Sequence, residues 1–198
     1  MGRIIASTNV TIDGSVGDPT GEEGRPGGGW FGRIGSADHD AFGRAALEEA
    51  RAAGAFLMGR HTYEVLASRW PDRTGPLAER LGEIDKFVVS ATLAGPAWRN
   101  TSVLRDDPVP AVAALKRRID GDIVVPASFR LVRALLDVDL VDELRVIVYP
   151  FLVGTGEPGY GHLSAAKRLH LLDHRRLGED LTYAAYRIDP GAEPPADR

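Results

Sequence analysis

One turn of the chain combines residue types that suit phosphate binding. Gly59-Arg60-His61-Thr62 stands where a short apolar run gives way to an amphipathic helix. Gly59 lets the backbone approach an anion closely, and Thr62 can cap the helix and donate a hydrogen bond. Arg60 offers a planar fork of N–H donors, and His61 adds another donor. Because the first N–H groups of a helix are unpaired and positive, this turn predicts an anion site.

Two further apolar runs end in comparable residues. Ser90-Ala91-Thr92 follows one run, and Ala127-Ser128 follows another. In an open α/β sheet, ligands bind beyond the carboxyl ends of the strands, so the three segments are expected to line one extended groove. A capped helix with solvated charges explains any single turn equally well. The three together favour a dinucleotide with several phosphates.

The elements that must position these turns alternate between strand and helix, which predicts a parallel sheet with crossover helices. The final third has strands without a long helix between them, which predicts antiparallel pairing. We therefore expect one α/β domain with a mixed sheet over residues 1–189 and a polar, proline-rich, disordered tail at 190–198. The strands are expected at residues 4–10, 55–58, 86–89, 101–104, 122–125, 143–149, 169–176 and 181–188, and the helices are expected to end near positions 53, 69, 118 and 136.

Composition excludes several classes of protein. The chain has no cysteine, which rules out disulfides, iron–sulfur clusters and thiolate zinc sites, and we expect no metal. A net charge of −4 argues against a nucleic-acid partner. No segment has the length of a signal peptide or a membrane span, so we expect a cytoplasmic protein with no membrane partner. The Rossmann and Walker glycine patterns are absent, so a nicotinamide cofactor would need another scaffold.

Five motifs in order resemble the dihydrofolate reductase superfamily. The resemblance is closest to the reductase domain of riboflavin biosynthesis, the C-terminal domain of bifunctional deaminase-reductases, and it covers nearly the whole chain. The motifs are Ile4-Ile5-Ala6-Ser7, Thr11-Ile12-Asp13-Gly14, Leu57-Met58-Gly59-Arg60-His61-Thr62-Tyr63-Glu64, Val88-Val89-Ser90-Ala91-Thr92-Leu93 and Leu140-Val141-Asp142-Glu143-Leu144.

The resemblance implies a mixed, mostly parallel sheet of about eight strands flanked by helices. It also implies NADPH as cofactor, a homodimer, and reduction of a pterin or dihydrofolate-like substrate or of a 5-amino-6-(5-phosphoribosylamino)uracil-like one by hydride transfer. By resemblance, the cofactor-binding residues are Gly14 beside the nicotinamide, Gly59, Arg60, His61 and Thr62 at the phosphates, Ser90, Ala91 and Thr92 at the adenosine, and Ala127, Ser128, Phe129 and Arg130 at the pyrophosphate.

The pyrophosphate turn departs from the family pattern. Ala127 replaces the first glycine of that turn and follows Pro126. The added methyl group is expected to narrow the groove, and the proline removes one N–H donor.

Candidate substrate residues come from the glycine-rich segment 17–35 and the helix after it. Asp38 stands four residues before Phe42, a spacing that puts both on one helix face and matches the acid that holds the pterin in dihydrofolate reductases. Asp40 competes for this catalytic role, and either residue can instead be a helix cap. Trp30 and Phe31 either stack on a flat heterocycle or anchor the loop to the core.

Two functions remain open from the sequence. The first is the NADPH-dependent reductase. Without cysteine, the chain cannot also hold the zinc site of the deaminase. The second is a non-catalytic nucleotide-binding or interaction protein on the same scaffold. Apolar residues such as Tyr149, Phe151 and Tyr183 either serve the dimer or lie in the core.

Overall fold

The computed structural model describes residues 2–154 and 158–191 of the 198 residues. The tail predicted at 190–198 lies outside the described residues from position 192 onward. No helix in these two ranges combines the length and the apolar character needed to cross a membrane.

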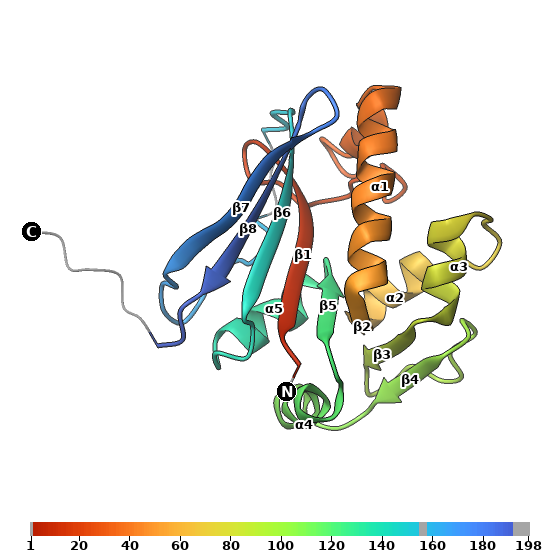
Figure 1. The fold of residues 1–198 in the computed structure, drawn as a ribbon, viewed down its shortest axis with the longest axis vertical. Coiled ribbons are helices and arrows are strands. Elements are labelled where there is room, and N and C mark those ends of the chain that lie inside the picture. The colour runs from red at the N-terminus through yellow and green to blue at the C-terminus, as the bar shows by residue number, and fades with distance from the viewer. Residues whose placement is uncertain (1, 155–157, 192–198) are drawn as a thin grey trace, which may run out of the picture.

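The described chain forms eight strands, five α-helices and one short 3-10 helix, η1. Figure 1 shows them as one sheet with helices on both sides. In chain order they are β1 (Ile4–Thr11), η1 (Trp30–Arg33), α1 (Ser36–Ala52), β2 (Ala53–Gly59), α2 (Arg60–Ala67), α3 (Pro76–Glu83), β3 (Asp85–Val89), β4 (Thr101–Leu104), α4 (Pro108–Arg118), β5 (Asp122–Pro126), α5 (Phe129–Leu136), β6 (Glu143–Tyr149), β7 (Leu169–Leu177) and β8 (Leu181–Ile188).

The sheet has the order β4-β3-β2-β5-β1-β6-β8-β7. All pairings from β4 to β6 are parallel, whereas β8 runs antiparallel to both β6 and β7. Each parallel neighbour needs a crossover, while β7 and β8 are joined by a tight turn at Gly178, whose φ is 63°. The predicted fold class, a mostly parallel mixed sheet with antiparallel C-terminal strands, is confirmed.

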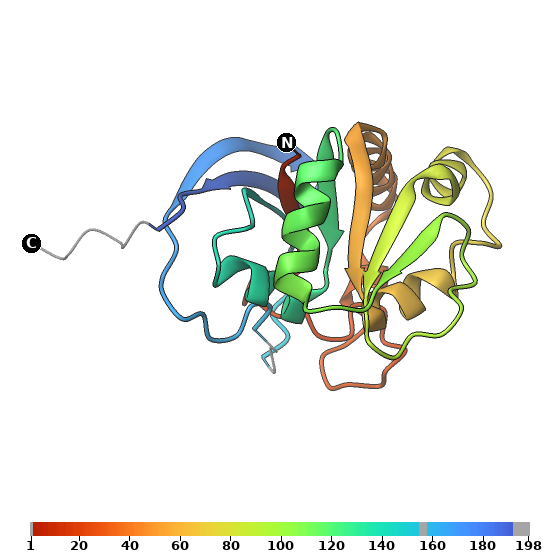
Figure 2. The same ribbon diagram turned by 90° about the horizontal axis from the view of Figure 1, so that it is seen from below.

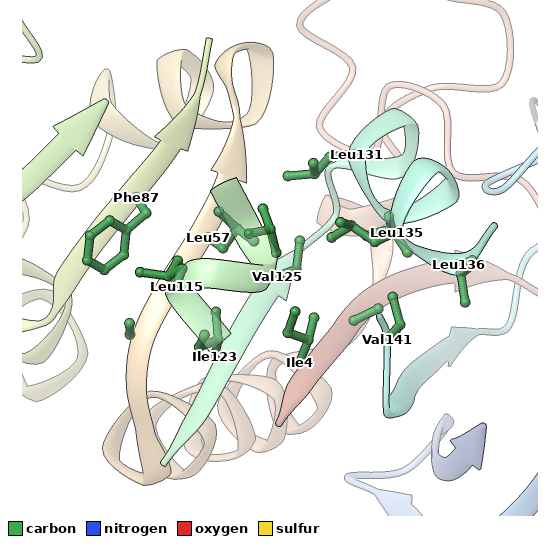
Figure 3. Close-up of a cluster of buried hydrophobic side chains, with 14 of the residues drawn as sticks. Ile4, Leu57, Phe87, Leu115, Ile123, Val125, Leu131, Leu135, Leu136 and Val141 are labelled. Carbon is green, nitrogen blue, oxygen red and sulfur yellow. The ribbon is translucent and has the colours of Figure 1, made fainter. Parts of the chain in front are cut away.

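Two hydrophobic layers hold the helices on the sheet. On one face, α4 and α5 pack on the central strands, with Leu115 and Leu135 against Ile4, Ile123 and Val125 (Figure 3). On the other face lie α1, α2 and α3. Burying one such leucine or isoleucine contributes about 1.5–3 kcal/mol of hydrophobic free energy, so the strands are held firmly in place.

Helix α3 was not predicted. Pro71 and Gly75 before its start, and Pro76 at its first position, are residues typical of loops. In the structure Gly75 has φ 101°, and Pro76 occupies the first turn of the helix, where its missing N–H is harmless. The buried Lys86 caps the C-terminal end of α3, because its Nζ donates to the carbonyls of Leu81 at 2.6 Å and Ile84 at 2.7 Å.

The strand register sets three strand ends at one level. Val89 at the end of β3 pairs with Gly59 at the end of β2. On the other side of β2, Phe56 pairs with Val124 of β5, which brings Pro126 at the end of β5 close to the same level. The next N–H, that of Ala127, donates to the Ser7 carbonyl of β1 at 2.9 Å. The three turns singled out from the sequence therefore leave the sheet along the same edge.

Candidate functional site

Hydrogen bonds join the three predicted turns. The N–H of Gly59 donates to Ser128 Oγ at 3.1 Å, linking the end of β2 to the end of β5. Arg60 Nη1 donates to Thr92 Oγ1 at 2.7 Å, linking β2 to the turn after β3. We call Gly59, Arg60, Thr92 and Ser128 the strand-end cluster. Residues spread over almost seventy positions of sequence thus meet at one place.

The first turn of α2 presents free donors beside this cluster. Gly59 is the N-cap, and no side chain caps the helix. Thr62 lies inside the first turn, so the expectation that it caps the helix is wrong. Arg60 is oriented by a second contact, from its Nε to Glu64 Oε1 at 2.7 Å. An uncapped helix start with an arginine beside it has the chemistry of an anion site.

The turn after β3 is built around Ser90. Its buried Oγ accepts from the N–H groups of Thr92 at 3.2 Å and Leu93 at 3.0 Å, so this hydroxyl shapes the turn. Ala91 and Thr92 are exposed. Arg105, which the sequence reading missed, donates to the carbonyls of Ala91 at 3.4 Å and Leu93 at 2.9 Å. Its position directly after β4, at the same sheet edge, was the available signal.

The turn after β5 adopts an unusual backbone. Ala127 and Ser128 have φ of 47° and 50°, so two successive residues with a Cβ occupy the left-handed region. Such a conformation costs roughly 1–2 kcal/mol per non-glycine residue. The contacts to Ser7 and Gly59 hold it in place. Ala127 therefore takes the backbone shape that a glycine would, but adds a methyl group.

Helix α5 starts directly after this turn. Ser128 is its N-cap, yet its Oγ faces Gly59 and makes no capping bond. Phe129 packs edge-on against Tyr160 with ring centroids 5.6 Å apart, so this side chain anchors the segment after β6. Arg130 is exposed. The unpaired N–H groups of α5 thus lie beside those of α2.

The turn after β1 is tied to the segment after β6. Gly14 has φ 84°, a conformation that glycine favours. Asp13 Oδ2 accepts from the N–H groups of Val153 at 2.9 Å and Gly154 at 2.8 Å. The hydrogen bond from the Thr11 hydroxyl is the largest cause that lowers the pKa of Asp13, and these two backbone hydrogen bonds lower it further. The sequence placed Gly14 beside the nicotinamide by resemblance, and it did not predict this clamp between Asp13 and the segment after β6.

The structure does not bring the two candidate acids to the strand-end cluster. Asp38 is only 2% exposed, and its Oδ1 accepts from the N–H groups of Glu179 at 2.7 Å and Asp180 at 3.1 Å. Asp38 therefore holds the β7–β8 turn, and its Oδ1 already accepts two backbone hydrogen bonds. Asp40 is exposed on α1.

The two aromatic residues of the loop act as anchors. Trp30 is 1% exposed, meets Tyr149 edge-on at 4.9 Å, and donates from Nε1 to the Gly17 carbonyl at 3.3 Å. Phe31 packs on Phe42 at 5.0 Å and on Tyr149 at 5.5 Å. Of the two roles left open, the geometry supports packing. Tyr149 is fully buried, so it belongs to the core.

The glycine-rich loop docks on α2. The loop folds around Asp18, whose carboxylate accepts hydrogen bonds from the N–H groups of Glu23 at 3.1 Å and Arg25 at 3.0 Å. Glu22 pairs with Arg69, and Glu23 Oε1 lies 3.3 Å from His61 Nε2. Figure 2 shows the loop beside α2 below the end of β2. His61, predicted to meet phosphate, therefore faces a carboxylate here.

A sequence model of the RibD C-terminal domain matches residues 3–183. The chain belongs to this family. No curated protein matches the chain. Family and fold together support an oxidoreductase of the reductase type.

Solved structures share the fold at low identity. A putative riboflavin biosynthesis protein from Shewanella sp. PV-4 is 18% identical, with a TM-score of 0.68 over 94% of this chain and 99% of that one. A diaminohydroxyphosphoribosylaminopyrimidine deaminase/5-amino-6-(5-phosphoribosylamino)uracil reductase from Thermotoga maritima is 16% identical, with a TM-score of 0.62; the match covers 95% of this chain and 57% of that one. Dihydrofolate reductase from Enterococcus faecalis, complexed with NADP(H), is 13% identical, with a TM-score of 0.56 over 94% and 96%.

Proposed function

We propose that the chain is an NADPH-dependent reductase that transfers hydride to a small heterocycle of the pterin or phosphoribosylaminouracil type. Family membership supports the reductase class. The Thermotoga maritima protein is named as a reductase of a phosphoribosylaminouracil, and the Enterococcus faecalis enzyme was crystallised with NADP(H). These descriptions suggest the cofactor and the substrate class.

The observation that carries the proposal is the convergence of the strand-end cluster. A dinucleotide needs several anion-binding groups along one edge, and the cluster joins three strand ends by two side-chain hydrogen bonds. The starts of α2 and α5 supply backbone N–H donors, and Arg60 and Arg105 supply charge. These donors fit a diphosphate, although the Ala127 methyl leaves less room than a glycine.

In the proposed reaction the bound NADPH supplies the hydride. The chain orients it: the α2 start and Arg60 bind phosphate, and the turn at Ala127 and Ser128 approaches the pyrophosphate with its backbone. The Asp13 clamp holds Gly14 at the neighbouring strand end. We assign no acid to the proton transfer, because Asp38 is bonded to the β7–β8 turn.

The hydrogen bonds from the β7–β8 turn to Asp38 also favour a second function, that of a nucleotide-binding protein that does not catalyse reduction. Asp38, Trp30 and Phe31, three of the four residues expected near the substrate, serve the packing of the fold, whereas Asp40 is exposed on α1. This version keeps the strand-end cluster and its ligand and lacks the reaction.

Calorimetric titration with NADPH tests both versions. Arg60→Gln should weaken NADPH binding by about tenfold, since a charge-assisted hydrogen bond to phosphate is lost. Arg117→Gln, an exposed arginine on α4, removes the same charge elsewhere and should leave the affinity unchanged. If the wild-type protein does not bind NADPH, both versions fail. Binding without NADPH oxidation across a panel of pterins and aminouracils selects the second.

We also propose that the chain forms a homodimer through β7. This edge strand exposes Leu169 by 41%, Leu171 by 60% and Leu172 by 54%. A long edge strand with exposed leucines invites pairing with another strand. Light scattering should give twice the monomer mass for the wild type and a shift toward monomer for Leu171→Lys, with the exposed Val138→Lys as the matched control.

A further inference from the structure

A groove lies between α3 and the segment that leads into β4, away from the strand-end cluster. Its volume is about 430 Å³. Figure 1 shows α3 at the outer side of the sheet, above β3 and β4. The side chains that dominate the groove are Trp70, Arg73, Glu79, Trp98 and Arg99, with Gly82 of α3 beneath them.

The Trp98 wall of this groove is held in place by its neighbours. Trp98 is 4% exposed, its N–H donates to Tyr63 Oη at 3.1 Å, and Lys86 Nζ lies 4.7 Å from its ring centroid. Trp70 is partly exposed and packs against the same core cluster as Trp98. Two of the three tryptophans of the chain thus line one hollow. Rigid indole rings give flat apolar surfaces at little entropic cost.

The groove also carries the guanidinium groups of Arg73 and Arg99, together with the carboxylate of Glu79. The Arg73 guanidinium lies 4.9 Å from the Trp70 ring centroid. The Arg99 guanidinium lies against the bare backbone of Gly82, where a Cβ would come within 2.3 Å of its Nη2. Among the residues that the structure describes, neither guanidinium makes a hydrogen bond or an ion pair. Arg99 lies close enough to Lys86 to disfavour that lysine's positive charge.

We propose that this groove binds a small planar anion, of the class of an aromatic carboxylate, at a site separate from the strand-end cluster. The partly exposed indole of Trp70 contacts the ring of the ligand, and the guanidinium groups of Arg73 and Arg99, neither of which has an ion-pair partner among the described residues, meet its carboxylate. Arginine suits this task because its planar fork matches a carboxylate. The volume falls within the usual range for small-molecule sites, roughly 300–1,000 Å³. The site does not depend on the reductase proposal.

Tryptophan fluorescence tests the proposal with para-nitrobenzoate, whose nitroaromatic ring quenches a stacked indole. We expect saturable quenching, and at least about fivefold weaker binding of the uncharged para-nitrobenzyl alcohol, which keeps the ring and loses the carboxylate. Arg73→Gln and Arg99→Gln should each weaken para-nitrobenzoate binding by about tenfold. Arg117→Gln is the matched control and should not.

Gly82→Ala provides a variant that keeps every charge. The new methyl group pushes the Arg99 guanidinium off α3, and alanine suits a helix, so the protein should fold and bind para-nitrobenzoate more weakly. Arg60→Gln and added NADPH should leave this binding unchanged, which separates the groove from the strand-end cluster. Absent or linear quenching overturns the proposal. So does equal binding of the alcohol, or displacement by NADPH.

Discussion

The backbone N–H of Gly59 donates a 3.1 Å hydrogen bond to Ser128 Oγ and so joins two strand ends that are 69 residues apart in the chain. The contact has two effects. It aligns the starts of α2 and α5 along one sheet edge, and it helps to hold Ser128 at its left-handed φ of 50°. The Ser128 hydroxyl therefore helps to set the shape of the candidate cofactor site.

Replacing that hydroxyl should separate its two effects. Ser128→Ala loses the hydrogen bond and keeps the strained backbone, so the free energy of unfolding should fall by about 1 kcal/mol and NADPH binding should weaken. Ser128→Gly also loses the bond, but glycine relieves strain of roughly 1–2 kcal/mol, so its stability should stay near the wild type. Urea denaturation measures both variants. Equal stabilities would show that the left-handed backbone is not strained.

Ala127→Gly introduces the glycine that the resemblance in sequence implies for this turn. Because Ala127 has φ 47°, glycine should raise the free energy of unfolding by up to about 1 kcal/mol. Loss of the methyl group should also tighten NADPH binding. The control is Ala114→Gly on the exposed side of α4, which should lose about 1 kcal/mol as glycine usually does in a helix. A destabilised Ala127→Gly would contradict the account of the turn.

Glu23→Gln tests the contact between the glycine-rich loop and α2. The Glu23 carboxylate lies 3.3 Å from His61 Nε2, so we expect it to compete with a bound phosphate for that ring. Even a fully charged pair at the surface is worth only up to about 1 kcal/mol, so NADPH should bind at most about fivefold more tightly once the carboxylate is removed. Glu22→Gln breaks only the contact to Arg69 and serves as the control. Unchanged NADPH affinity in Glu23→Gln would exclude this competition.

Lys86 should make the free energy of unfolding depend on pH in the alkaline range. Burial, and then the nearby Arg99, lower its pKa from 10.5 to about 8. Between these two values the unfolded chain still binds a proton that the folded protein has released, so this lysine makes the free energy of unfolding increase with pH. Below about pH 8 both states carry the proton and the dependence ends.

Denaturant titrations in steps from about pH 7.5 to about pH 10 measure that increase. Lys86→Met should flatten the curve across this window, because no group with a shifted pKa remains at the position. Lys167→Met, which removes an ammonium paired with Asp139 at 2.8 Å, should keep the slope. A slope that persists in Lys86→Met would assign it to other groups.

Local signals predicted most elements of the fold. The predicted bounds of β4, β6 and β8 coincide with those observed, because each strand is a contiguous run flanked by turn residues. Helix α3 was missed because Gly75 and Pro76, usual loop markers, form its cap and first turn. Both cases depend on short stretches of chain.

The candidate site shows where sequence reasoning ends. Motifs at strand ends indicated the Gly59, Thr92 and Ser128 regions, since parallel strands end along one edge. The partner of Asp38 could not be foreseen, because the N–H group of Glu179 is 141 residues away. An aspartate at a helix start looks the same whether it binds a substrate or another turn.

The glycine-rich loop has a consequence for motion. A segment with so many glycines would ordinarily be flexible. Here the backbone amides of Glu23 and Arg25 both donate to the buried carboxylate of Asp18. The segment should therefore swing as one rigid piece about its two ends. Hydrogen exchange would then record the Glu23 and Arg25 amides opening in concert, at a common rate.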